Sequence, residues 1–396
     1  MLSLSLLISA LAATSSATKL YVSSYTGTIT SLSLSNQNGA YNLAKLDTNN
    51  NCQPNASWLH LDAKHENLFC LDEGIIVANG SVNSFKVNKG TGALKLVKRM
   101  STLAAPVNSV LYTSSNGSQL LTVAHYTTAL TTYKVDSDTG SFTLLQTLNF
   151  TMTKPGPHAD RQKVPHPHQV LVDPSNKYLV VPDLGADLVR VFYVDPATLA
   201  LVPRTSIPVV PGSGPRHGRF LTKGGSTFYY LVTEIGSTLS GYKVTSLPNN
   251  GGLNMTLIND SKTYGNGNAT VFAGSAAAEI NITPNGKSII VSNRNATYTT
   301  IANPDPKNAT MIPSDSLAHF SISGGNGQFV FDQLSPAGGS FPRHMSENHD
   351  GTLMAVGLQL TGRVVIYAMD KELGTLGTKV LADFEGLGNV TSIVWA

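Results

Sequence analysis

The sequence predicts an all-β protein that closes into a propeller of seven blades. Three observations predict this fold class. A unit of three apolar or alternating strands joined by polar turns recurs along the chain, the two ends carry complementary parts of one further unit, and no segment shows a sustained helical period. Only 13% of the 396 residues are charged, and 35 Gly and 20 Pro are spread throughout, which suits many short strands joined by turns.

The recurring unit appears six times, at intervals of roughly 48–65 residues that are near the longer propeller repeats. A fourth, less regular strand is visible in places, for example over residues 201–209, as expected for an outer edge strand. A β-sandwich would also be all-β, but it would not explain a regular three-strand unit. The clearest copies cover residues 166–195, 216–244, 277–295 and 343–370, and looser copies cover 57–74 and 108–135.

The two ends of the chain supply the seventh unit. Residues 19–35 resemble the second and third strands of a unit whose first strand is missing, and residues 389–396 resemble a lone first strand. Pairing them would close the ring and remove the open sheet edges that invite aggregation. A longer spacing before the last full copy holds a Pro/Asn-rich stretch, residues 298–315, which we expect to form a loop over one face.

The N-terminal segment predicts export. Residues 2–13 form an apolar run too short to span a bilayer, and Ser15-Ser16-Ala17 supplies small residues suited to cleavage. No Lys or Arg precedes the run, so a buried first strand is the alternative. We therefore expect a signal peptide over 1–17, a single propeller domain over 18–396 and a secreted, extracellular protein. No other stretch approaches the roughly 20 apolar residues of a membrane helix.

Two further patterns agree with export. Cys52 and Cys70 are the only cysteines, and an oxidising compartment would allow them to form a disulfide, although two separate buried thiols are the alternative. Asn-X-Ser/Thr triplets are dense, which predicts a glycosylated surface. The candidate acceptors are Asn55, Asn79, Asn116, Asn149, Asn254, Asn259, Asn268, Asn281, Asn295, Asn308 and Asn389.

Charge and motif content exclude several classes of function. The net charge is only +3 and no Lys/Arg run stands out, so neither nucleic-acid binding nor electrostatic membrane attachment is expected. Nucleophile-elbow, Walker and dinucleotide-binding motifs are absent from the sequence, and we expect no cofactor. The His-X-His of His166 and His168 could hold a metal, but no carboxylate spacing demands one, so none is predicted. The sequence predicts no oligomeric state.

Polar residues concentrate where first strands start and second strands end. In a propeller these two places meet at one mouth of the central channel, so residues from different blades converge there. We predict His168, Arg216, Glu234 and Arg294 as catalytic residues and His166, His217, Arg343 and Gln359 as substrate-binding residues, from the fourth to the seventh blade. Arg216 and Glu234 can pair, and the pairing lowers the pKa of the glutamate while burial raises it.

A family resemblance accompanies these positions. The segments 166–187, 214–220, 232–239, 278–286, 292–295 and 341–357 are similar to those of the seven-bladed lactonase family, which includes 6-phosphogluconolactonases and carboxy-cis,cis-muconate cyclases. The resemblance covers nearly all of the chain after the apolar run. It implies that His168, Arg216, Glu234 and Arg294 form the site, with His168 or Glu234 handling protons and the arginines holding carboxylates. Leu358-Gln359 departs from the Asn-Gln pair common in the family.

The resemblance implies an enzyme that acts on small acidic lactones. Hydrolysis of the 6-phosphogluconolactonase type is the leading expectation, and the lactone-forming cycloisomerase reaction on a muconate-like substrate uses the same residues. Export disagrees with cytosolic roles of this kind, which weakens the assignment of a cellular substrate. The hypothesis from another class is a non-catalytic propeller that binds a ligand.

Overall fold

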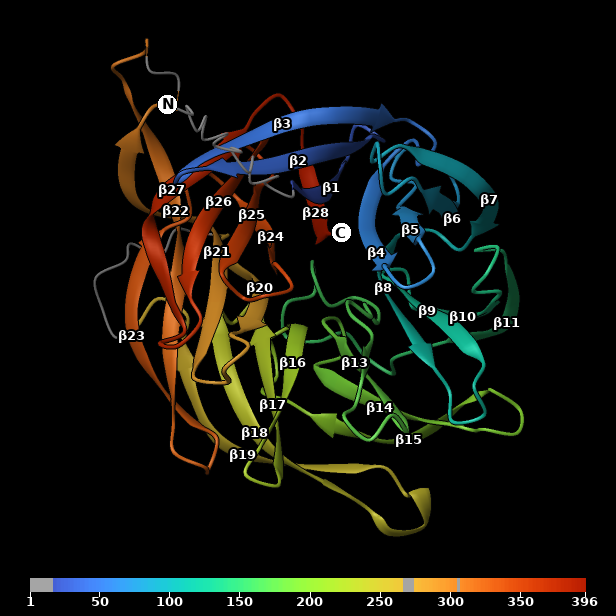
Figure 1. Cartoon of the computed structure of the whole chain (residues 1–396). Helices are drawn as coiled ribbons and strands as arrows, with labels where there is room; N and C mark the ends of the chain where they lie inside the picture. The colour runs from blue at the N-terminus through green and yellow to red at the C-terminus, as the bar shows by residue number, and fades with distance from the viewer. Residues whose placement is uncertain (1–16, 266–273, 305–306) are drawn as a thin grey trace, which may run out of the picture.

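The computed structural model describes residues 17–265, 274–304 and 307–396, whose strands form seven four-stranded antiparallel sheets around a central channel (Figure 1). From the channel outward, the first four blades are β28 (Val390–Trp395), β1 (Thr18–Ser24), β2 (Ile29–Gln37), β3 (Ala40–Asn49); β4 (Ala56–Asp62), β5 (Asn67–Asp72), β6 (Gly80–Val87), β7 (Leu94–Thr102); β8 (Pro106–Thr113), β9 (Gln119–His125), β10 (Ala129–Val135), β11 (Phe142–Asn149); and β12 (Leu171–Val172), β13 (Tyr178–Asp183), β14 (Leu188–Val194), β15 (Leu201–Pro208).

The last three blades carry the longest strands. β21 and β22 extend far beyond the rest of their sheet and form the hairpin that projects from the ring at the upper left of Figure 1. These blades are β16 (Pro215–Lys223), β17 (Ser226–Thr233), β18 (Thr238–Ser246), β19 (Leu253–Lys262); β20 (Ala276–Ile282), β21 (Ser288–Ala302), β22 (Met311–Ser323), β23 (Gln328–Pro336); and β24 (Pro342–Glu347), β25 (Leu353–Leu358), β26 (Arg363–Asp370), β27 (Thr375–Phe384).

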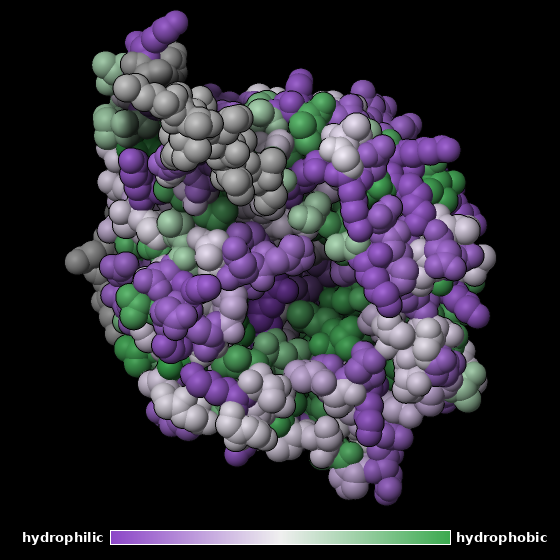
Figure 2. All heavy atoms as spheres, in the orientation of Figure 1, coloured by the Kyte–Doolittle hydropathy of each residue, from purple (hydrophilic) through white to green (hydrophobic). Residues whose placement is uncertain are grey.

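The ring closes through the two ends of the chain, which confirms the prediction. β28 pairs antiparallel with β1, placing Trp395 opposite Leu20, and the hydroxyls of Ser23 and Thr391 are 2.8 Å apart. First strands of neighbouring blades contact one another around the channel. Figure 2 shows the channel as a hollow at the centre of one face, with hydrophilic side chains on one part of its wall and hydrophobic ones on another.

Apolar side chains hold neighbouring blades together. Strand residues alternate between the two faces of each sheet, so every blade has an apolar face toward each neighbour. In one such layer Phe228 and Tyr230 of the fifth blade pack against Ile289 and Phe320 of the sixth. Cys52, in the connection before β4, forms a disulfide with Cys70 of β5, as the sequence allowed.

Two local expectations are wrong. Residues 298–315 do not form a loop over one face, because β21 and β22 continue through Thr299–Ala302 and Met311–Ser314 as paired strands. The β-branched residues of this stretch favour a strand, and only its tip is irregular. The first strand of the fourth blade does not begin at His166: β12 is confined to Leu171–Val172, preceded by an isolated bridge at Pro167.

Helical structure is nearly absent from the described residues. The single helical segment there is a 3-10 turn at Pro248–Asn250. None of the described helical segments is long and apolar enough to cross a membrane. Residues 1–16 of the expected signal peptide and the triplet at Asn268 lie outside the described residues.

Candidate active site

A repeated backbone irregularity places the charged residues at the channel. In the fifth blade Pro215 faces Thr233 but His217 faces Val232, so Arg216 is the extra residue of a β-bulge at the start of β16. Arg343 is the extra residue at the start of β24. A bulge re-aims side chains and is common beside active sites. The bulges of the earlier blades carry Ser57 and Val107 instead, which are uncharged.

Three arginines converge on one buried carboxylate. Glu234, just past the end of β17, accepts from Arg216 Nε at 2.9 Å and pairs with Arg294 Nη2 at 2.7 Å through the same oxygen, Oε2. Arg161 pairs with the other oxygen. Burial alone would raise the pKa of Glu234, but the arginines outweigh it and hold the pKa well below its usual range. Glu234 is therefore ionised at neutral pH.

A chain of hydrogen bonds fixes the tautomer of His168. Glu279 Oε2 lies 3.0 Å from His217 Nδ1, and His217 Nε2 lies 3.2 Å from His168 Nδ1. An ionised carboxylate only accepts, so His217 Nδ1 carries the proton and His217 Nε2 accepts from His168 Nδ1. His168 Nε2 is then left with a lone pair. Burial, followed by the positive charge of Arg216, lowers the pKa of His168 well below its usual value, so the imidazole is neutral.

Further side chains surround this cluster. Arg343 lies over the ring of Tyr25, 5.0 Å from its centre, and the Tyr25 hydroxyl donates to Glu73 at 2.6 Å. Tyr126, which follows β9, stacks on His166 with ring centres 4.0 Å apart. Arginines outnumber glutamates in this group, which leaves a formal excess of positive charge. Its members are Arg161, Arg216, Arg294, Arg343, Glu73 and Glu234. We call this group, together with His168, the arginine mouth.

The structure brings the four predicted catalytic residues to one place. Glu234 joins Arg216 and Arg294 directly, and the charges of Arg216 and Glu234 act on the nearby His168. Each comes from a different part of the ring: the segment before β12, the β16 bulge, the end of β17 and β21. Arg294 Nε is buried and has no hydrogen-bond partner within the described part of the chain.

The four predicted substrate-binding residues behave differently. Arg343 belongs to the arginine mouth. His166 Nδ1 forms a hydrogen bond with the backbone carbonyl of Tyr126, and the His166 ring stacks on the Tyr126 ring. His166 therefore holds the Tyr126 ring in place. His217 is 1% exposed and both its ring nitrogens face protein partners, so we revise its role from substrate binding to positioning of His168. Gln359 is buried at the end of β25, and no hydrogen bond joins it to the Glu234 cluster within the described residues.

Sequence reasoning missed Arg161 and Tyr126 as partners in the cluster, and it placed Glu279 at this mouth, at the start of a first strand, without giving it a role. Arg161 lies in the long connection between β11 and β12, outside the blade repeat, so no periodic signal marks it. Tyr126 directly follows the end of the second strand β9. Its stacking on His166 depends on the path of the connection between β11 and β12, which the blade repeat does not specify. Among the described residues no group of three or more His, Cys, Asp or Glu side chains could hold a metal ion.

Proteins with similar sequences are lactonases by name. One is "Probable 6-phosphogluconolactonase" of Arthroderma benhamiae, 26% identical over 92% of this chain and 86% of the relative. Another is "6-phosphogluconolactonase" of Formosa agariphila, 27% identical over 81% of this chain and 83% of that protein.

Solved structures share the fold. A periplasmic gluconolactonase of Pseudomonas aeruginosa aligns with a TM-score of 0.78 at 23% identity, over 96% of this chain and 99% of that one. A protein from Bacteroides fragilis described as a putative 6-phosphogluconolactonase gives 0.77 at 23% identity, over 97% and 99%. The sequence profile described as "Lactonase, 7-bladed beta-propeller" matches residues 19–391. With seven four-stranded blades in the described residues and this match across nearly the whole chain, the protein belongs to the seven-bladed β-propeller lactonase family.

Proposed function

We propose that the protein is a lactonase that hydrolyses small acidic lactones of the 6-phosphogluconolactone type at the arginine mouth. The observation that carries the proposal is the convergence of Arg161, Arg216 and Arg294 on Glu234, beside a neutral imidazole of fixed tautomer. The excess positive charge suits a phosphate or carboxylate, which guanidinium groups bind as planar forks. The names of the relatives support the same reaction class.

We propose the following steps. The lone pair of His168 Nε2 takes a proton from water as the water oxygen forms a bond to the lactone carbonyl carbon. The charge that develops on the carbonyl oxygen is stabilised by the guanidinium groups of the arginine mouth. The ring C–O bond then breaks, and the proton passes from His168 to the leaving ring oxygen. Glu234 stays ionised and holds the arginines in place.

We also propose that the chain acts outside the cytosol, with residues 1–17 as a signal peptide and 18–396 as the mature propeller domain. The Cys52–Cys70 disulfide supports this proposal, because disulfides persist in oxidising compartments. Asn55 and Asn281 are buried and their side chains are hydrogen-bonded within the protein, so we expect no glycan on either. Exposed candidate acceptors are Asn79, Asn116, Asn149, Asn254, Asn295, Asn308 and Asn389.

The test is acid release by the purified protein from 6-phosphogluconolactone and glucono-1,5-lactone, corrected for spontaneous hydrolysis. We expect the phosphorylated lactone to be turned over faster. His168→Gln keeps a side chain of similar reach without the base and should lower kcat by roughly 10²–10⁴-fold. Arg216→Ala removes a guanidinium group of the arginine mouth and should abolish turnover. Arg204→Ala, in the outer strand β15, is its matched control and should retain full activity.

Two outcomes would overturn the proposal. One is full activity of His168→Gln, which would remove the base from its assigned place. The other is no turnover of either lactone by the folded protein, as a ligand-binding propeller would show. 3-Carboxymuconate is included as a substrate, so that consumption of this compound without lactone hydrolysis would indicate the cycloisomerase reaction instead.

A further inference from the structure

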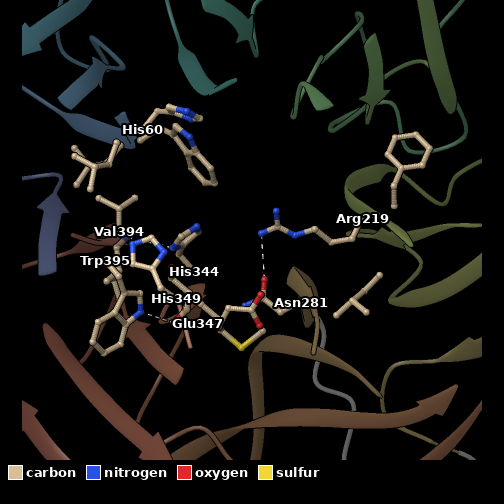
Figure 3. A pocket seen from close by; sticks show the side chains of 16 residues that line it. His60, Arg219, Asn281, His344, Glu347, His349, Val394 and Trp395 are labelled. Carbon is tan, nitrogen blue, oxygen red and sulfur yellow. Dashed lines mark hydrogen bonds between the residues drawn. The ribbon is translucent and has the colours of Figure 1, made fainter. Parts of the chain in front are cut away.

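A second cavity lies at the opposite mouth of the channel, where the first strands end. Its volume is about 490 Å³, within the usual range of small-molecule sites. It is lined by last residues of first strands, including Ile282, Glu347 and Trp395, whereas the arginine mouth lies where these strands start. Figure 3 shows His60 of β4, Arg219 of β16, Asn281 of β20, and His344 and Glu347 of β24 around it.

A layer of side chains separates the two mouths. Trp58, His217 and His344 each follow the bulge of their own first strand, and they meet in the channel. The Trp58 ring lies 4.8 Å from that of His344 and 5.8 Å from that of His217, both edge to face. Glu279 joins the layer and is fully buried. The second cavity is therefore a separate site and not a continuation of the first.

Two buried polar atoms in its wall are without partners. Trp58 Nε1, a donor, and Glu347 Oε2, an oxygen, hold no hydrogen bond within the part of the chain that the structure describes. A buried polar atom without a partner costs about 1–3 kcal/mol, and a ligand hydroxyl bonded to these two atoms would remove that cost. Neither atom forms a hydrogen bond within the described residues, so a new hydrogen bond to a ligand hydroxyl would replace no existing one.

The charge of this cavity differs from that of the arginine mouth. Arg219 is a cationic side chain in the lining of this cavity. It donates hydrogen bonds to Asn281 Oδ1 at 3.1 Å and to the Ile280 carbonyl at 3.0 Å. His344 Nδ1 accepts from the Ile393 backbone, and burial lowers the pKa of His344 to about 4, so the ring is neutral. Burial also raises the pKa of Glu347. Glu279 Oε1 lies 3.8 Å from Arg219 Nη2 and offsets its charge, so an anion would find little excess positive charge here.

We propose that this cavity binds a neutral sugar, of one or two rings. An indole wall with adjacent donors and acceptors offers an apolar face together with hydrogen bonds, which matches the alternating C–H faces and hydroxyls of a sugar. A neighbouring cavity of about 590 Å³ shares Trp58, His60 and Arg219 with it, which gives room for a second ring. In the complex, Trp58 Nε1 donates to a sugar hydroxyl and Glu347 accepts from another.

The test uses intrinsic fluorescence, because the two tryptophans of the chain, Trp58 and Trp395, both line this cavity. Titration of the full protein with D-glucose, maltose and cellobiose should give a saturable change in tryptophan emission with at least one of them. The change should persist in His168→Gln, because His168 lies in the arginine mouth and does not line this cavity. Sodium gluconate, an open-chain anion, should bind at least tenfold more weakly than the best neutral sugar.

Paired variants locate the response. Glu347→Gln and Trp58→Phe each remove one proposed contact, and each should weaken binding about tenfold, which corresponds to roughly 1.4 kcal/mol. In Trp58→Phe the remaining reporter is Trp395, and near-ultraviolet circular dichroism checks that the fold persists. Glu372→Gln, an exposed glutamate in the turn between β26 and β27, is the control and should bind as the unaltered protein does.

Several results would overturn the proposal. They are no saturable response to any of the three sugars, tighter binding of gluconate than of a neutral sugar, and unchanged affinity in Glu347→Gln and Trp58→Phe. Loss of the response in His168→Gln would move the sugar to the arginine mouth and also overturn it. Failure here leaves the lactonase proposal intact, since the lactone assay does not depend on the second cavity.

Discussion

The two mouths of the channel are built from the same strands and differ in chemistry. At the arginine mouth, the bulge residue Arg216 pairs with Glu234, and the bulge residue Arg343 lies over the ring of Tyr25. At the opposite mouth, residues further along the same strands supply Trp58, Arg219 and Glu347 around a cavity of about 490 Å³. The innermost strands of the blades can therefore carry a positively charged cluster at one end of the channel and a nearly charge-balanced cavity at the other.

The comparison also separates blades from one another. The bulge position holds Ser57 or Val107 in the second and third blades, but Arg216 and Arg343 in the fifth and seventh. The backbone device is common to these blades, and the charge is confined to the later ones. The proposed chemistry therefore depends on which side chain occupies the bulge, and not on the bulge itself.

The largest expected effect is on catalysis when the link between the two mouths is altered. In Glu279→Gln the side-chain amide can donate as well as accept a hydrogen bond, so His217 Nδ1 no longer has to carry the proton. The tautomer of His168 is then no longer fixed. We expect kcat to fall by roughly 10²–10⁴-fold with little change in KM, by analogy with carboxylates that orient a catalytic histidine. Steady-state kinetics measure this, and partial recovery in Glu279→Asp would support a positioning role. An unchanged kcat would contradict it.

The next effect concerns stability, and it contrasts two glutamates. Glu234→Gln leaves the buried Arg216 and Arg294 without their anionic partner, and removing one partner of a buried pair typically costs about 3–5 kcal/mol. Glu347→Gln loses no protein hydrogen bond at Oε2 and should change the free energy of unfolding by less than about 1 kcal/mol. Urea unfolding of both variants checks this, and equal losses would remove the distinction.

A smaller effect is expected in the pH profile. Because the pKa of His168 is lowered, the neutral base persists below pH 6.5, so the acid limb of kcat/KM should lie below that value. Arg343 is one of the positive charges that lower this pKa. Arg343→Gln should therefore move the acid limb to higher pH, by less than about one unit. Arg204→Gln is the control, and a shift to lower pH in Arg343→Gln would contradict the assignment.

The smallest effect is the response to salt. Raising NaCl from about 0.05 to about 0.5 M screens the arginine mouth, so KM for 6-phosphogluconolactone should rise a few-fold. The KM for glucono-1,5-lactone, which has no phosphate, should rise less. Sugar binding at the opposite cavity should not change. A parallel change at both sites would show that the two mouths do not differ in charge as proposed.

Much of the architecture was predictable because blade strands carry a strong local signal. Alternating apolar runs and turn residues indicated the repeat, and the incomplete units at the two ends indicated the closure by β28 and β1. The hairpin at 298–315 was missed because Pro and Asn near its tip outweighed the β-branched residues on either side. The short β12 was missed because an apolar run after His168 does not show where ladder pairing begins.

The site was only partly predictable. The position rule brought Arg216 and Glu234 together, because adjacent strand ends must meet. It could not decide whether burial or charge controls the pKa of Glu234, since that depends on Arg161 and Arg294 from other segments. Nor could it place His217 between His168 and Glu279, because a one-residue bulge changes which side chains face the channel.

The pairing of β28 with β1 has a consequence for biosynthesis. Ser23 must wait for Thr391, 368 positions later in the chain, before the first blade has its inner strand. At about 5–20 residues per second, translation leaves that edge open for roughly 20–70 s. An unpaired strand edge can template aggregation in that interval. Premature termination anywhere before residue 390 would leave this edge of β1 permanently without its partner strand.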